Sequence, residues 1–135
     1  MRVLLDTNVL LDYLVEREPY YESAKTIIFM CAKKEIDGYI AAHSVMNAFY
    51  ILRKDFSINE RRSILLKLCE LVEIVGIDKS KIISSLSNEQ FSDFEDRLQT
   101  ECAIECNAKY IITRNIKDFT HSEIPAIEPV EFLKL

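Results

Sequence analysis

The chain of 135 residues contains only two glycines, three prolines and no tryptophan. Because Gly38 and Gly76 are its only glycines, it has neither a G-x-G-x-x-G fingerprint nor a Walker A loop, which excludes a phosphate cradle of glycine backbone. It also lacks the ~20 consecutive apolar residues that a membrane helix requires. Asp6, Asn8 and Asp12 interrupt the apolar amino-terminal stretch, which argues against a signal peptide. We therefore expect a cytoplasmic protein with no membrane contact.

Basic residues are outnumbered, with 17 lysines and arginines against 22 aspartates and glutamates and a net charge of −5. A protein that binds nucleic acid through its overall positive potential is normally basic. Any role in nucleic-acid binding therefore depends on a local basic patch or on metal ions that offset the acids.

The chain has few residues for a zinc site, because its four cysteines form no C-x-x-C pair and only two histidines accompany them. The cysteines fall in helix-like apolar stretches, so we expect buried, reduced thiols. They are Cys31, Cys69, Cys102 and Cys106.

Short apolar runs alternate with amphipathic stretches along the chain. Val3-Leu4-Leu5 is typical of a strand buried on both faces, and Asp37-Gly38 is expected to form a turn. The alternation predicts a single α/β domain over residues 1–135 with a mostly parallel sheet. The predicted strands are Val3–Leu5, Tyr39–Ala41, Tyr110–Thr113 and the edge strand Ala126–Glu128. The run Leu71–Ile77 fits either the end of a helix or a strand, and a short strand closing at Gly76 is favoured. A first helix is predicted directly after Asp6. Five further helices are predicted over about Tyr20–Lys34, Ser44–Lys54, Ser57–Glu70, Lys79–Ser87 and Ser92–Asn107.

Polar side chains follow the predicted strands at the edge where such sheets bind ligands, beyond the carboxyl ends of the strands. The helix that begins at Ser92 runs antiparallel to the strand after it, so its amino end lies at the same edge. That end carries the acids Asp93, Glu95 and Asp96; Glu95 is assigned to a capping box with Ser92, and Asp96 is the most inward of the three. The side chains expected at this edge are Asp6, Asn47, Asp96, Thr113, Asn115 and Asp118.

Crowded carboxylates repel one another unless a cation shares them, and Mg²⁺ or Mn²⁺ prefers oxygen ligands. Such a metal binds a phosphate oxygen and lowers the pKa of a water, which suits hydrolysis of a phosphodiester. No G-x-S-x-G motif competes with this interpretation, and His43 and His121 have no evident partner.

Taken one at a time, these residues also fit structural roles. Asp6 fits the cap of the first helix, the acids near Ser92 complement a helix dipole, and Asn115 fits a turn. Their convergence at one edge favours a site. Asp12 is assigned to the solvated surface.

Three segments resemble the signature segments of PIN domains: LLDTNVLLDYL, DFEDRLQTECA and YIITRNIKDF. The resemblance extends over essentially the whole chain, at a length similar to the VapC-like toxins. It implies a three-layer α/β/α fold with a central parallel sheet and a Mg²⁺- or Mn²⁺-dependent ribonuclease site. It further implies an RNA substrate, a small antitoxin protein as partner, and a homodimer.

By position, the resemblance assigns Asp6 as the first family acid and Asp96 as the third. Asp118 belongs to the last motif together with Asn115, and Thr113 matches the hydroxyl residue beside the site. On this basis Asp6, Asp96 and Asp118 are the expected metal ligands.

The chain departs from the family pattern at Asn47, where a glutamate is usual, and at Asn115, where many relatives have an acid. Asn47 retains a carbonyl oxygen that can orient a water, but it removes one negative charge. A catalytically impaired PIN-fold module that binds RNA or a protein partner is therefore the alternative. The small size disfavours a flap-type DNA nuclease.

Two groups of basic residues are candidates for RNA contact. Arg114 and Lys117 lie beside the expected site. The densest basic cluster consists of Arg53, Lys54, Arg61 and Arg62.

Overall fold

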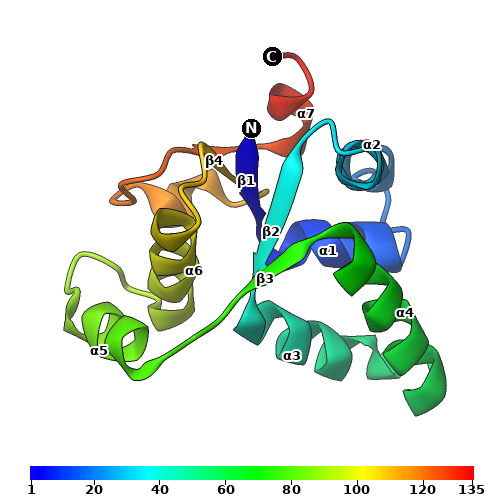
Figure 1. Ribbon diagram of the computed structural model, residues 1–135, viewed down its shortest axis with the longest axis horizontal. Coiled ribbons are helices and arrows are strands. Elements are labelled where there is room, and N and C mark those ends of the chain that lie inside the picture. Colours follow the sequence, from blue (N-terminus) through cyan, green and yellow to red (C-terminus); the bar gives the residue numbers. More distant parts are fainter.

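The computed structural model describes all residues from Met1 to Leu135, and its five strands form one sheet in the order β3-β2-β1-β4-β5 (Figure 1). Every neighbouring pair of strands is parallel, as predicted. The strands are β1 (Arg2–Leu5), β2 (Asp37–Ala41), β3 (Glu73–Val75), β4 (Tyr110–Ile112) and β5 (Ala126–Ile127).

Helices connect the strands and cover both faces of the sheet. The α-helices are α1 (Thr7–Leu14), α2 (Tyr21–Ala32), α3 (Ala42–Ile51), α4 (Ile58–Leu71), α5 (Lys79–Ser87), α6 (Phe94–Glu105) and α7 (Pro129–Phe132). Two 3₁₀ turns, η1 (Leu52–Lys54) and η2 (Ile116–Phe119), follow α3 and β4. None of these helices has both the length and the hydropathy needed to cross a bilayer.

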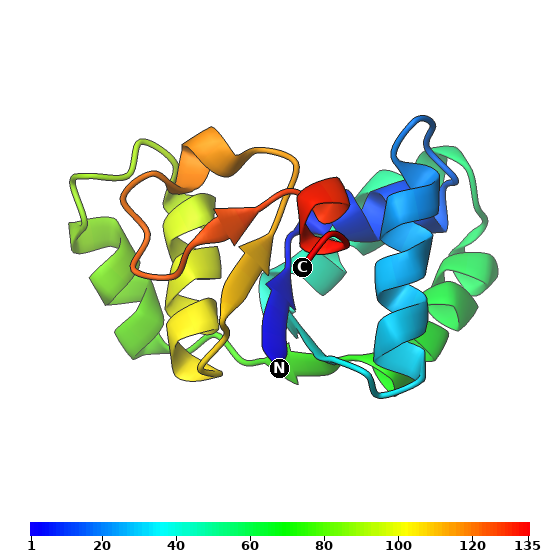
Figure 2. The ribbon, with the colours of Figure 1, turned by 90° about the horizontal axis from the view of Figure 1, so that it is seen from above.

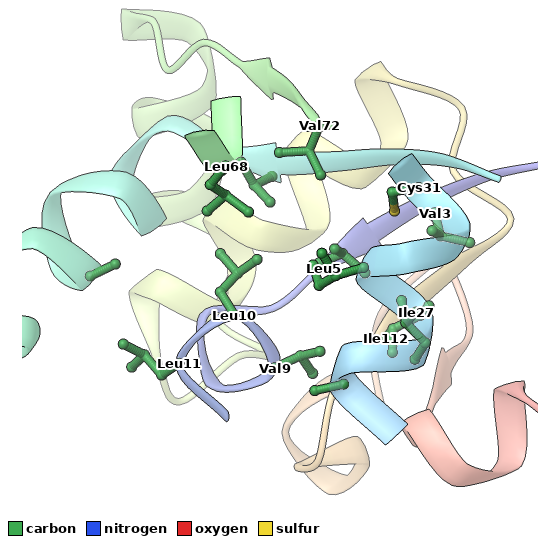
Figure 3. Packing of buried hydrophobic residues seen from close by; sticks show 14 of the residues in the cluster. Val3, Leu5, Val9, Leu10, Leu11, Ile27, Cys31, Leu68, Val72 and Ile112 are labelled. Carbon is green, nitrogen blue, oxygen red and sulfur yellow. The ribbon is translucent and has the colours of Figure 1, made fainter. Parts of the chain in front are cut away.

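Two hydrophobic cores, one on each side of the sheet, make the fold a three-layer α/β/α structure (Figure 2). On one side Val3 and Leu5 pack with residues of α1, α2 and α4, including Leu10 and Leu68 (Figure 3). On the other side Leu4 packs against α6, with α5 outside it. Successive residues of a strand point to opposite faces, so β1 is buried on both, as its apolar run predicts.

Most predicted elements are confirmed with small changes of boundary, and two details are wrong. Asp37 and Gly38 form the start of β2 rather than a turn. A Cβ atom at Gly38 would lie 2.5 Å from Cys31 Sγ and 3.1 Å from Val72 Cγ1, so the glycine permits close packing of α2 on the sheet. Cys69 is exposed, whereas the other three cysteines are buried.

The strand order places a topological switch point at the centre of the sheet. From β1 the chain adds β2 and β3 on one side, and then returns to add β4 and β5 on the other. The backbone N–H of Asp6 donates to the carbonyl oxygen of Ile112 at 3.0 Å, so the chain leaving β1 stays against the end of β4. In open α/β sheets the ligand crevice lies at such a point.

Candidate functional site

A pocket of about 560 Å³ lies at the carboxyl ends of β1 and β4, and its lining is mostly polar. Five carboxylates face it, from the end of β1, the amino end of α6, and η2. Arg17 is its only basic residue. The polar and charged residues of the lining are Asp6, Thr7, Asn8, Arg17, Asn47, Asp93, Glu95, Asp96, Asn115 and Asp118.

Five of the six side chains expected at this edge line the pocket, and the sixth, Thr113, is hydrogen-bonded to Asp6 of the lining. Thr113 is fully buried, and its hydroxyl donates to Asp6 Oδ2 at 2.8 Å. The same hydroxyl oxygen accepts from the backbone N–H of Asn115 at 3.0 Å. Thr113 therefore joins the start of the last motif to the acid that follows β1.

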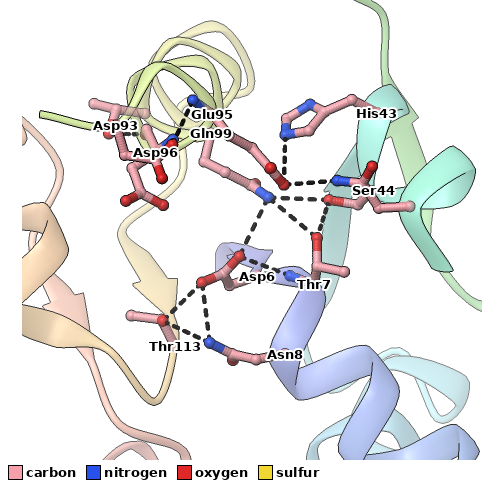
Figure 4. A network of polar contacts seen from close by, with 12 residues as sticks. Asp6, Thr7, Asn8, His43, Ser44, Asp93, Glu95, Asp96, Gln99 and Thr113 are labelled. Atoms are coloured by element: carbon pink, nitrogen blue, oxygen red, sulfur yellow. Dashed lines mark hydrogen bonds and ion pairs between the residues drawn. The ribbon is translucent and has the colours of Figure 1, made fainter. Parts of the chain in front are cut away.

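Asp6 is the most buried acid of the pocket and accepts four hydrogen bonds (Figure 4). Its Oδ1 accepts from the backbone N–H of Thr7 at 2.7 Å, so Asp6 caps α1 as well as facing the pocket. Its Oδ2 accepts from Thr113 and from Asn8 Nδ2 at 3.3 Å. Burial raises the pKa of Asp6, and the hydrogen bonds from Thr113 and Thr7 partly oppose that shift.

A buried polar network connects Asp6 to α3 and α6. Gln99 of α6 has no exposed surface, and its Nε2 donates to Asp6 Oδ1 at 3.3 Å and to Ser44 Oγ at 3.0 Å. The Thr7 hydroxyl donates to Ser44 Oγ at 2.8 Å. Because these groups come from three segments far apart in the chain, the network fixes α3 and α6 relative to Asp6.

The amino end of α6 differs from the expected capping box. The cap is Asp93, whose Oδ1 accepts from the backbone N–H groups of Glu95 at 2.7 Å and Asp96 at 3.2 Å. The prediction of a Ser92–Glu95 box is wrong, because Glu95 instead accepts a hydrogen bond from Asn47 across the pocket.

Asp96 is strongly affected by its surroundings. Burial, together with the charges of Asp93, Asp6, Asp118 and Glu95, raises the pKa of Asp96 to about 7. No hydrogen-bond donor opposes this shift. Asp118, on η2, and Asn115, just before it, are exposed at the rim.

Without metal, the raised pKa of Asp96 predicts that the protein loses stability as pH rises. The folded state binds more protons than the unfolded state between pH 3.8 and about 7, so this contribution to stability is present at low pH and lost through neutrality. Asp96→Asn is expected to raise the free energy of unfolding by about 1 kcal/mol at pH 8, a value reduced for partial solvent exposure, and by less than half as much at pH 5. Urea unfolding in EDTA at both pH values measures this, and equal stabilities of wild type at pH 5 and 8 would contradict it.

Asn47 projects from α3 toward α6, and its Nδ2 donates to Glu95 Oε1 at 2.7 Å. His43, one turn earlier on α3, has Nε2 3.6 Å from the same oxygen. Burial lowers the pKa of His43, which favours a neutral imidazole. His43 therefore does face a carboxylate, although its sequence context shows no partner.

Asp12 is buried in an ion pair, so its assignment to the solvated surface is wrong. Its side chain is 1% exposed and accepts from Arg114 Nε at 2.6 Å and Nη2 at 3.1 Å. Arg17 Nη1 lies 3.5 Å from Asp12 Oδ1. The Arg114 guanidinium also covers the Tyr20 ring at 4.0 Å from its centroid. Arg114 is thus part of the structure beside the site rather than a free loop cation.

Three residues of the site have roles that the sequence does not indicate. Asn8 contacts both Asp6 and Thr113 and accepts from the backbone N–H of Arg114 at 3.4 Å. Gln99 and Glu95 of α6 contact Ser44 and Asn47 of α3. The one available signal is Gln99, a polar residue three positions after Asp96 on a face that continues with Ala103.

The chemistry of the donor set fits a hard divalent cation. All the charged groups facing the pocket except Arg17 are carboxylates, and amide oxygens accompany them. A cation would relieve the repulsion that raises the pKa of Asp96. No three acids, histidines or cysteines already surround one point as a metal cluster. The acids would therefore have to approach one another for a cation to be held by three of them.

Fold and pocket together define an α/β/α protein with an acidic site at the switch point of a parallel sheet. A family model described as PIN domain matches residues 2–117. The chain therefore belongs to the PIN domain family, a family of nucleases. No curated protein matches it in sequence.

Solved structures, one of them a toxin–antitoxin complex, have the same fold. A toxin–antitoxin complex from Klebsiella pneumoniae matches with a TM-score of 0.68 at 22% identity, over 94% of this chain and 97% of that one. VapBC2 from Rickettsia felis, bound to a DNA fragment from its promoter, matches with a TM-score of 0.68 at 19% identity, over 95% of this chain and 98% of that one. FitAB bound to an IR36 DNA fragment matches with a TM-score of 0.71 at 16% identity, over 94% of each chain. At these identities the likeness shows the fold.

Proposed function

We propose that the protein is a Mg²⁺- or Mn²⁺-dependent endoribonuclease, the homodimeric toxin of a toxin–antitoxin pair. The observation that carries this proposal is the convergence of five carboxylates on one pocket at the switch point of a PIN domain. An acidic pocket with amide groups at its rim suits a divalent cation and the phosphodiester that the cation would bind.

In this proposal Asp6, Asp96 and Asp118 hold the metal. A bound Mg²⁺ or Mn²⁺ supplies a Lewis acid at the phosphate and makes a water easier to deprotonate. Thr113 holds Asp6 in orientation through its 2.8 Å hydrogen bond. Asn115, exposed at the rim, offers an amide to the phosphate or to a water.

The rim of the pocket offers a place for an unpaired base. Tyr50 lines the pocket and is 62% exposed, and the Arg53 guanidinium lies 3.7 Å from its ring centroid. Arg53 and Arg61, from the same basic cluster, each donate to a backbone carbonyl oxygen at 2.9 Å, that of Tyr50 and that of Phe49 respectively. An exposed tyrosine beside a cation suits the stacking and phosphate contacts of single-stranded RNA.

Tyr50→Ala is expected to weaken binding of a short single-stranded RNA about tenfold, because base stacking on an aromatic ring contributes ~1–3 kcal/mol. Tyr50→Phe retains the ring and should bind like the parent. Stopped-flow fluorescence anisotropy in Mn²⁺, with the metal site intact, measures affinity before cleavage, and Phe29→Ala, an exposed aromatic residue away from the pocket, is the control. Equal affinities for Tyr50→Ala and its parent would exclude this contact.

The proposed activity is tested by incubating the purified protein with transfer, messenger and single-stranded RNAs. Cleavage is expected with Mg²⁺ or Mn²⁺, and its loss is expected in EDTA. An Asp96→Asn protein prepared in parallel controls for contaminating ribonuclease. Metal-independent cleavage, or equal cleavage by the variant, would refute the proposal.

A second pocket supports an antitoxin protein as partner. It measures about 610 Å³ and is lined mainly by apolar residues from the ends of α1 and α2, the segment after η1, and α4. Tyr13, Ile64 and Leu71 line it and are only partly buried, so the apolar stripe of α4 is not fully covered by the chain itself. Such a groove suits the apolar face of an amphipathic helix. One structural neighbour, from Klebsiella pneumoniae, is a toxin–antitoxin complex.

A non-catalytic PIN-fold module that binds RNA or a protein is the second candidate. It is favoured by Asn47, which removes a charge from α3, and by the lack of a preformed metal cluster. Calorimetric titration with Mn²⁺ separates the two candidates, because only the nuclease requires the metal.

A further inference from the structure

We propose that Glu95 is a further carboxylate of the metal site, supplied by α6 in place of an acid on α3, and that Asn47 is the residue that positions it. This inference rests on the proposed nuclease function. It assigns a role to the hydrogen bond between the two side chains, which joins α3 to α6 across the pocket.

The contacts of Glu95 hold one of its carboxylate oxygens and leave the other free. Asn47 Nδ2 donates to Oε1 at 2.7 Å, and His43 Nε2 lies 3.6 Å from the same Oε1. Asn47 is the only side chain that donates a hydrogen bond to the Glu95 carboxylate. The orientation of the Glu95 carboxylate is thus set by α3, and its Oε2 remains available for a ligand.

Glu95 also lies close to the other acids of the pocket. It lines the same pocket as Asp6, Asp96 and Asp118, and its negative charge acts on both Asp6 and Asp96. Consecutive residues of an α-helix point about 100° apart. Asp96 and Glu95 therefore approach the pocket from different directions, with Glu95 on the α3 side (Figure 4).

Asn47 has a hydrogen-bond donor at the position where an acidic residue would have a negative charge. The negative charge is instead on Glu95 of the neighbouring helix α6, to which Asn47 donates its hydrogen bond. An acid at position 47 would face Glu95 at 2.7 Å, where two carboxylates repel strongly. The pair Asn47 and Glu95 therefore retains one negative charge at this wall of the pocket and fixes it in place.

The test separates the charge of Glu95 from its hydrogen bond. Glu95→Gln retains an oxygen that accepts from Asn47, and so preserves the contact between α3 and α6. Mn²⁺ affinity, measured by isothermal titration calorimetry on the full chain, is expected to fall at least tenfold in Glu95→Gln with an unchanged melting temperature. Glu105→Gln, at the far end of α6 beside Lys81, is the control and should bind Mn²⁺ like wild type.

Moving the charge back to α3 gives a second readout. Asn47→Glu alone is expected to lower the melting temperature, because two acids then face each other. The double variant Asn47→Glu/Glu95→Gln should recover both stability and Mn²⁺ affinity to within about threefold of wild type. If Glu95→Gln binds Mn²⁺ like wild type while Asp6→Asn does not, this inference is overturned and the proposed function stands. If wild type binds no Mn²⁺, both are overturned.

Discussion

Replacing Asp6 with asparagine is expected to lower RNA cleavage at saturating Mn²⁺ by at least ~100-fold, since loss of one metal ligand removes several kcal/mol of charge stabilisation. Asp6 is only 8% exposed, and Asn8, Gln99, Thr113 and the backbone of Thr7 all donate to its carboxylate. Four donors on one carboxylate fix its orientation more firmly than that of any other acid in the pocket.

The substitution should leave the fold intact, which makes the loss of activity interpretable. The asparagine oxygen can still accept from the backbone N–H of Thr7, and its amide can donate to the Thr113 hydroxyl, which also acts as an acceptor. Burial of the charged Asp6 carboxylate is unfavourable, as its raised pKa indicates, so removing the charge offsets the stability lost with the hydrogen bonds. Initial cleavage rates and melting temperatures are compared with those of Asp37→Asn, an exposed acid at the opposite end of the sheet. Retained cleavage by Asp6→Asn would place the reaction elsewhere.

Under the proposed function, the distribution of charge would explain how a chain of net charge −5 acts on a polyanion. Five of its 22 acids face one pocket, where a divalent cation would bind, and the Arg53–Tyr50 pair lies at the rim. Affinity for RNA is then local and depends on the metal. We expect weak binding to nucleic acid in EDTA, because the acids repel the phosphates when no cation is bound.

The sequence predicts the layers of this fold well because burial on two faces leaves a direct pattern. Val3 to Leu5 is uniformly apolar, and β1 is the central strand that both cores contact. Gly38 shows the limit of such reasoning. A glycine after an aspartate is typical of a turn, and nothing local in the sequence reveals that Cys31 packs against its backbone.

The position of the acids in the candidate site can be predicted from the order of strands and helices, whereas the side chains that contact them cannot. Asp6 and Asp118 follow β1 and β4, whose carboxyl ends meet at one edge, so their proximity can be predicted. The contact of Asn47 with Glu95 spans 48 positions of the chain, and that of Asp12 with Arg114 spans 102. Side-chain pairing between distant segments depends on the final packing, and residue type alone assigns these groups to the surface or to a cap.

Removing the buried acid Asp12 is expected to cause the largest loss of stability. Asp12→Ala should lower the free energy of unfolding by about 3 kcal/mol, because it leaves the Arg114 guanidinium without its partner in a largely buried position. The Asp12 side chain is 1% exposed and that of Arg114 is 23% exposed, so solvent compensates only part of the loss. The expected fall in melting temperature is about 10 °C for a chain of this length.

A double-mutant cycle with Arg114→Ala separates the ion pair from the loss of packing. The double variant should be more stable than the sum of the two single effects predicts, by about 2 kcal/mol, since neither charge is then left unpaired. The Asp12 variant should also bind Mn²⁺ less tightly, because Arg114 lies between Thr113 and Asn115 and its backbone N–H donates to Asn8. Additive effects of the two substitutions in urea unfolding would show that the pair contributes packing alone. Loss of stability with unchanged Mn²⁺ affinity would show that the ion pair supports the fold without orienting the site.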